Sequence, residues 1–163
     1  MSKLHQDRIA NVASRLATTI NDVIFVTPGA DLRYLTGYDA LPLERLTCLA
    51  VRSSGEAWMI VPTLEKPSAL AHHVPDMGIE LLDWQETQNP YSILLSAVGS
   101  VTQPLVNNLM WVEKAFGLQG ASQVNVELAG KLLSDIREVK SDHEIACLHE
   151  AGSAIDAVHD KMH

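Results

Sequence analysis

The stretch LTCLAVRSSGEAWMIV, residues 46–61, decides the fold class. It contains two apolar runs rich in strand-favouring residues, Leu46–Val51 and Ala57–Val61, and only the five residues RSSGE separate them. A glycine-containing loop of this length is typical of a connection between adjacent antiparallel strands. We therefore predict a β-hairpin, with Pro62 ending its second strand. A sheet that contains this hairpin cannot be purely parallel.

Short apolar runs alternate with helical patterns on both sides of the hairpin. Further strands are predicted at Val23–Val26, Ile79–Trp84 and Leu109–Val112, with a possible last strand at Val124–Val126. Helices are predicted for the first segment, where Ile9, Val12, Leu16 and Ile20 form one apolar stripe, and for residues 63–73 and 90–99; the run Ala115–Gln123 is ambiguous. This alternation predicts an α/β domain of three layers, in which a mixed β-sheet is flanked by helices.

Composition and charge narrow the classes of function. The chain has 163 residues, 47% of them apolar, and a formal net charge of -8, which argues against a nucleic-acid partner. We find no apolar run long enough to span a membrane and no secretory signal pattern. Cys48 and Cys147 form no CxxC pair, so we expect both to be small core residues in a reducing compartment. These features favour a cytoplasmic protein without membrane association.

The last predicted helix has a clear beginning and no clear end. Ser141 and Glu144 have the spacing of a capping box, and Asp142 places negative charge at the positive end of the helix dipole. Apolar residues then recur at helical spacing as far as Met162, and no Gly, Asn or Pro stops the pattern. The pattern alone predicts a helix with a defined first turn and no defined last turn, since a terminal helix can simply fray.

Two stretches resemble the amino-terminal domain of the creatinase/prolidase/aminopeptidase P family, the pita-bread metallopeptidases. They are DLRYLTGYDALPLERLTCLAV, residues 31–51, and LLSDIREVKSDHEIACLHEAGSAID, residues 132–156. The resemblance implies a creatinase/prolidase N-terminal domain-like fold with a ribonuclease H-like motif at residues 1–140. Residues 141–163 would then be the first helix of the junction to a catalytic domain that lies outside this chain.

The same resemblance implies the function of the parent protein. It would hydrolyse Xaa-Pro peptide bonds as a dipeptidase or aminopeptidase P, using two divalent metal ions, Mn or Co, held by the catalytic domain. The present chain would carry no cofactor, would be inactive alone, and would help to form a homodimer and restrict access to the active site. Two alternatives stay open: a creatinase-type amidinohydrolase as the parent, or a stand-alone interaction module.

The loop GYDALPLER, residues 37–45, is the candidate site. In the family this loop lies at a dimer and domain interface and can reach the rim of the active site, which makes Tyr38, Asp39, Leu41, Leu43, Glu44 and Arg45 the candidate residues. Many relatives have Asp and His where this chain has Leu41 and Leu43. The leucines would favour an apolar substrate residue or a drier interface, and packing without any substrate contact is the simpler interpretation.

Simpler interpretations also apply to the other polar residues of this region. We expect Glu44 and Arg45 to form a surface ion pair and Asp31 to be an N-cap. Tyr34, Leu35 and Tyr38 are expected to pack, with the tyrosine hydroxyl groups hydrogen-bonded.

No metal or nucleophile site is predicted within the chain. His159 and His163 have i, i+4 spacing but lack a third ligand, and the side chains of His72 and His73 should point apart. Cys48 is the one candidate nucleophile, and its place within a predicted strand favours burial.

Overall fold

The computed structural model describes residues 2–162, and residues 48–62 form the predicted hairpin. Strands β2 (Cys48–Arg52) and β3 (Ala57–Pro62) pair antiparallel, with Ala50 opposite Trp58. The turn is closed by hydrogen bonds from the Arg52 N–H to the Glu56 carbonyl (2.9 Å) and from the Gly55 N–H to the Arg52 carbonyl (3.0 Å). The hairpin is the antiparallel centre around which the remaining strands are arranged.

The other strands complete a mixed sheet of six strands in the order β4-β3-β2-β1-β5-β6. They are β1 (Val23–Val26), β4 (Ile79–Trp84), β5 (Pro104–Val106) and β6 (Glu127–Leu128). β1 pairs antiparallel with β2, whereas β3–β4, β1–β5 and β5–β6 are parallel pairs. The predicted mixed sheet is therefore confirmed.

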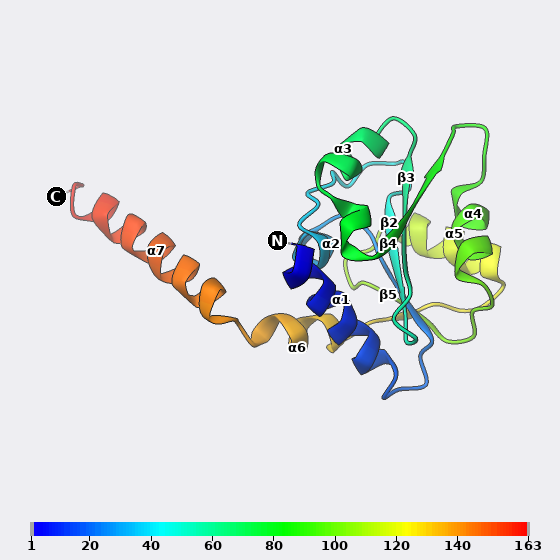
Figure 1. Cartoon of the computed structure of the whole chain (residues 1–163), viewed down its shortest axis with the longest axis horizontal. Helices are drawn as coiled ribbons and strands as arrows, with labels where there is room; N and C mark the ends of the chain where they lie inside the picture. The colour runs from blue at the N-terminus through cyan, green and yellow to red at the C-terminus, as the bar shows by residue number, and fades with distance from the viewer. Residues whose placement is uncertain (1, 163) are drawn as a thin grey trace. The chain divides into compact units, whose positions relative to one another are not determined.

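Helices cover both faces of this sheet. They are α1 (Ser2–Leu16), α2 (Ala30–Thr36), α3 (Lys66–Ala71), α4 (Pro90–Val98) and α5 (Val112–Ser122), with a short 3₁₀ helix, η1 (Val74–Met77), before β4. Helices α1 and α2 lie on one face, and α4 and α5 lie on the other (Figure 1). The arrangement confirms the predicted α/β architecture of helix, sheet and helix layers.

Alternation along the strands builds a core on each side of the sheet. On one side, side chains of β1 to β5 pack with Leu94 and Val98 of α4 and Leu118 of α5. The strand residues of this core are Val23, Phe25, Cys48, Ala50, Trp58, Ile60, Trp84 and Val106. The intervening strand residues Ile24, Leu49 and Met59 are also fully buried. Both faces of the sheet are therefore apolar, as expected for a sheet with helices packed on both faces.

Three predicted elements differ in the structure. Residues 109–112 are not a strand. The strand of this region is β5, which ends at Val106, and the side chains of Leu109 and Val112 are exposed. The ambiguous run after residue 114 belongs to α5, and the last strand lies at 127–128 instead of 124–126. Ile20 is 80% exposed and follows α1, so it does not belong to the apolar stripe of that helix.

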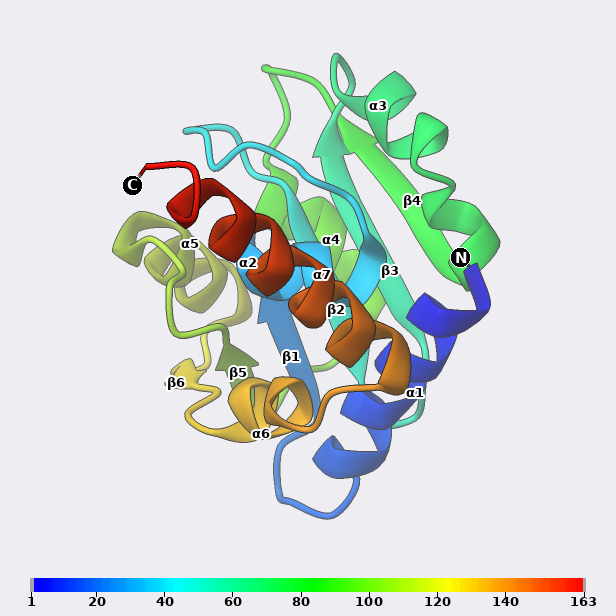
Figure 2. The same cartoon turned by 90° about the vertical axis from the view of Figure 1, so that its left-hand side faces the viewer.

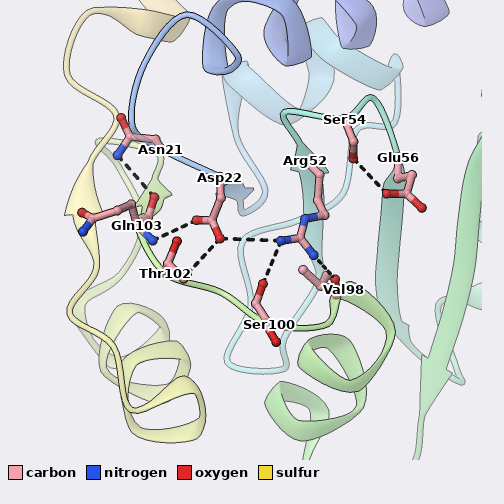
Figure 3. Close-up of polar contacts among 9 residues, drawn as sticks. All are labelled: Asn21, Asp22, Arg52, Ser54, Glu56, Val98, Ser100, Thr102 and Gln103. Atoms are coloured by element: carbon pink, nitrogen blue, oxygen red, sulfur yellow. Dashed lines mark hydrogen bonds and ion pairs between the residues drawn. The ribbon is translucent and has the colours of Figure 1, made fainter.

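A polar network connects the beginning of β1, the end of β2 and the loop after α4 (Figure 3). The Asp22 carboxylate accepts hydrogen bonds from the Thr102 and Gln103 N–H groups, at 2.8 and 2.9 Å. Arg52 donates to the Val98 carbonyl (2.5 Å) and the Ser100 carbonyl (2.7 Å), and its Nη2 lies 3.6 Å from Asp22. The network holds the loop that delivers β5 to the sheet.

The chain divides into two compact units, residues 1–133 and 134–163. The helix α6 (Leu132–Glu138) crosses this division and is followed by α7 (Asp142–His159), drawn in orange to red in Figure 2. The predicted capping box is present, since the Ser141 hydroxyl accepts from the Glu144 N–H and the Glu144 carboxylate accepts from the Ser141 N–H. Cys147 is exposed on α7, so its predicted place in a core is wrong. None of the helices within residues 2–162 is long and apolar enough to cross a membrane.

Candidate functional site

The candidate loop begins where α2 ends. Gly37 adopts a left-handed conformation (φ 69°), and its N–H bonds to the Arg33 carbonyl at 2.7 Å. This residue turns the chain into the loop because glycine reaches positive φ without strain. Gly29 is the N-cap of α2 and provides no side-chain hydrogen bond; Asp31 lies in the first turn, so the prediction that it is the N-cap is wrong.

Tyr38 anchors the beginning of the loop to α3. It is 2% exposed, and the centre of its ring lies 5.1 Å from the centre of the His72 ring. Burial raises the pKa of Tyr38, and the nearby Glu65 adds to this rise. The expectation that this tyrosine packs is confirmed, as is the burial of Leu35.

The middle of the loop is exposed. Asp39 lies 3.5 Å from Arg33 in a solvent-exposed ion pair. Leu41 and Leu43 are 68% and 41% exposed, and the Leu43 N–H bonds to the Leu41 carbonyl at 3.0 Å. Because two large apolar side chains close together face solvent, this part of the loop is suited to contact with another apolar surface.

The end of the loop has different partners from those expected. Arg45 forms an ion pair with Glu86, with 2.6 Å between Nε and Oε1, so the predicted pair with Glu44 is wrong. The Glu44 backbone carbonyl instead accepts a hydrogen bond from the Nζ of Lys114 in α5. The loop is thus attached to two distant parts of the chain, the residues after β4 and the first turn of α5.

A hollow lies between this loop, the end of β1, the beginning of β2 and α5. Its walls are formed by Thr27, Pro28, Pro42, Leu43, Arg45, Thr47, Trp111 and Lys114. Buried Asn107 helps to shape it, because its Oδ1 accepts from the Thr27 N–H (3.0 Å). Two candidate residues, Leu43 and Arg45, therefore share one hollow, whereas Tyr38 belongs to the core beside it.

Trp111 and Lys114, which lie far from the candidate loop in the sequence, are among the residues of this hollow that sequence reasoning missed. The signal was weak: Lys114 and Leu118 have i, i+4 spacing and are both buried in α5. A lysine on the buried side of a helix is unusual enough to be noticed once the helix itself is recognised.

The described residues offer no other obvious chemical centre. Within residues 2–162, no three His, Cys, Asp or Glu side chains are close enough together to hold a metal ion. His72 bonds to the Ser68 carbonyl (2.9 Å) and His73 to Asp76 (3.0 Å), so the two rings have different partners. His163 lies outside the described residues, so the structure does not test the i, i+4 spacing of His159 and His163. Burial raises the pKa of the Cys48 thiol to about 12, which removes it as a nucleophile near neutral pH.

Comparison with known proteins now bears on this arrangement. A family model of the creatinase/prolidase N-terminal domain matches residues 8–139. The chain belongs to this family.

Similar proteins share the fold over nearly all of the chain. The probable dipeptidase PepE of Mycobacterium tuberculosis is 30% identical over 162 residues, which cover 99% of this chain and 43% of PepE. The crystal structure of dipeptidase PepE from Mycobacterium ulcerans superposes with a TM-score of 0.91 at 31% identity, over 98% of this chain and 43% of that one. This chain therefore spans less than half the length of these two relatives.

Solved structures that consist of this domain alone are also similar to the chain. The N-terminal domain of Xaa-Pro dipeptidase from Lactobacillus brevis has a TM-score of 0.69 at 15% identity, over 80% of this chain and 98% of that one. At this identity the likeness supports the fold alone.

Proposed function

We propose that this chain is the non-catalytic N-terminal domain of a metallopeptidase that hydrolyses Xaa-Pro dipeptides. One observation carries the proposal: the chain matches the PepE structure of M. ulcerans over 98% of its length with a TM-score of 0.91. The proposed cellular location is the cytoplasm, where both thiols, Cys48 and Cys147, would stay free, as they are in the structure.

The chemistry is assigned to a catalytic domain. A pair of Mn or Co ions would supply an activated water for amide hydrolysis. Residues 2–162 of this chain do not fit such a pair, since they contain no cluster of three or more suitable ligands. We therefore derive no catalytic step from this chain, and its proposed role is to shape the approach to the active site.

The exposed part of the loop would serve this role. Leu41 and Leu43 are proposed to contact a second copy of the chain or the apolar part of a peptide, with Glu44 and Arg45 at the polar rim. Tyr38 and Asp39 would hold the first part of the loop, Tyr38 through α3 and Asp39 through Arg33. A rigidly attached loop that presents apolar side chains can exclude water from a neighbouring site and select short peptides.

A domain exchange tests the proposal. The matched part of M. tuberculosis PepE is replaced by this chain, and Xaa-Pro dipeptide hydrolysis is measured with Mn²⁺ or Co²⁺. We expect the chimera to turn over the dipeptide and the 163-residue chain alone to match a metal-free blank. Turnover by the chain alone, or activity of the chimera on creatine in place of the dipeptide, would contradict the assignment.

A matched pair of variants tests the loop within the chimera. Leu43→Ser should change kcat/KM or weaken dimerisation, because it removes an apolar contact. Ile20→Ser removes a side chain that is even more exposed but lies before β1, at the opposite end of that strand from the hollow, and should change neither. Equal behaviour of the two variants would remove the proposed role of the loop.

A further inference from the structure

Lys114 is a cationic residue with a buried side chain. It lies in the first turn of α5 and is 5% exposed. Its Nζ donates a hydrogen bond to the Glu44 carbonyl and lies 6.0 Å from the centre of the Trp111 ring. An ammonium group has three donors and a full charge, and a single neutral carbonyl compensates only part of the cost of burying it.

No carboxylate of the described residues neutralises this charge. Lys114 takes part in none of the ion pairs found within residues 2–162. Two carboxylates are bonded to other residues of the walls: Glu86 pairs with Arg45, and Glu65 accepts from the Thr47 hydroxyl at 3.1 Å. The buried ammonium is therefore the charge at this hollow that lacks an opposite charge.

The position of Lys114 in the helix makes its charge less favourable still. The N-terminus of a helix carries a partial positive charge, which disfavours a cation in the first turn. The N-cap residue, Trp111, provides no side-chain hydrogen bond to this terminus. Burial, missing ion pairing and the helix dipole thus all disfavour a lysine here, and a bound anion would relieve all three.

We propose that the hollow binds a carboxylate group that is attached to an apolar group. Lys114 would provide the positive charge, with the first turn of α5 adding to the positive potential. Pro42, Leu43 and Trp111 supply apolar walls beside it, and Thr47 and Arg45 also line the hollow. This inference goes beyond the proposed peptidase function and is tested by binding alone.

A purely structural role for Lys114 makes a different prediction. If the side chain only attached the candidate loop to α5, glutamine would also serve, because it keeps a neutral N–H donor. A requirement for positive charge, in contrast, is specific to binding of an anion. The variants Lys114→Gln and Lys114→Arg separate the two roles.

Indole N–H resonances provide the measurement. The full chain, labelled with ¹⁵N, is titrated with 3-methylbutanoate and, in parallel, with the neutral 3-methylbutanamide. Trp111 is 46% exposed at the hollow and is the reporter. The Trp58 and Trp84 indoles, which donate to Glu80 (3.0 Å) and to the Leu46 carbonyl (2.9 Å), are internal controls.

We expect 3-methylbutanoate to shift the Trp111 resonance with a Kd in the millimolar range, about 1–10 mM. The amide should give no saturable shift up to about 50 mM. Lys114→Gln should weaken binding at least about tenfold, and Lys114→Arg should retain it within that factor. The proposal is overturned by an amide that binds as well as the acid, by a Lys114→Gln variant that binds like the wild type, or by an unmoved Trp111 resonance. Dispersed spectra of both variants establish that they are folded.

Discussion

His5 shows how one buried side chain can make folding depend on pH. It is 8% exposed in α1, and its Nδ1 atom has no hydrogen-bond partner within the described part of the chain. Burial lowers the pKa of His5, the charge of Arg8 lowers it further, and backbone hydrogen bonds with Tyr34 and Leu35 offset only part of the effect. Since the ordinary pKa is about 6.5, the unfolded chain takes up a proton at this histidine before the folded chain does.

We therefore predict that stability falls as the pH is lowered below about 6.5, until the lower pKa of the folded state is reached. The variant His5→Gln cannot take up this proton. Its free energy of unfolding should fall less between about pH 7.5 and 5.5 than that of the wild type. Urea unfolding at the two pH values measures the difference, and identical losses in the two proteins would exclude His5 as the cause.

Side-chain partners were the least predictable part of the candidate site. The motif around residues 31–51 was enough to locate the loop, and the burial of Tyr38 followed from its aromatic character. The partners of Arg45 and Glu44 are 41 and 70 residues away, at Glu86 and Lys114. Such contacts depend on strand order, which local patterns do not contain, so a neighbour in the sequence was wrongly chosen as the partner of Arg45.

At the scale of elements, the contact between α4 and α5 depends on a glycine. A Cβ atom at Gly117 would lie 2.2 Å from Cζ of Tyr91, far inside van der Waals contact. We predict that Gly117→Ala destabilises the protein by roughly 1–3 kcal/mol through overpacking, although alanine favours the helix.

Gly120 is the matched control in the same helix. A Cβ atom there would meet nothing within 4 Å. Gly120→Ala should therefore stabilise the protein by about 0.5–1 kcal/mol, the usual difference between the two residues in a helix. Thermal or urea unfolding of both variants gives opposite signs if the Tyr91 ring is the cause, and the same sign if helix propensity alone decides.

The Asp22–Arg52 network supports a second prediction about elements (Figure 3). Both side chains are largely buried, with exposed fractions of 19% and 22%, and Arg52 bonds to the last carbonyl of α4. Removing the Arg52 guanidinium takes this donor away from the Val98 and Ser100 carbonyls. Arg52→Met should therefore lower the free energy of unfolding by about 1.5–3 kcal/mol.

The control is the exposed pair of Arg33 and Asp39, with side-chain exposure of 66% and 65%. Arg33→Met should cost no more than about 0.5 kcal/mol. Urea unfolding compares the two variants. If both variants lose the same free energy of unfolding, the network around Asp22 stabilises the protein no more than an ordinary surface ion pair does.

Element prediction succeeded where apolar runs were also buried. The hairpin, β1 and β4 combine strand-favouring residues with clear turn signals, and all three are found close to their predicted bounds. The run Leu109–Val112 has the same composition but is mostly exposed, whereas the real strand, Pro104–Val106, has only three residues and begins with proline. A strand this short is specified by its neighbours β1 and β6 and carries little signal of its own.

At the scale of the whole molecule, the family match and the buried residues both end before α7. The creatinase/prolidase model ends at residue 139, within the short segment between α6 and α7. In α6, Leu133 and Ile136 are buried, at 6% and 4% exposure. In α7 no residue is buried, although apolar side chains recur along it. Stability should therefore depend on α6 and not on α7.

Two truncated chains test this difference. A chain that ends after Lys140 loses no buried side chain, so its Tm should stay within about 2 °C of the wild type while its helical circular dichroism decreases. A chain that ends after Gly130 also loses Leu133 and Ile136, each of which contributes about 1.5–3 kcal/mol when fully buried. The Tm of this second chain should fall by several times the change expected for the chain that ends after Lys140. Differential scanning calorimetry measures both values. If the shorter deletion lowered the Tm as far as the longer one, α7 would stabilise the domain in a way that its exposed side chains do not explain.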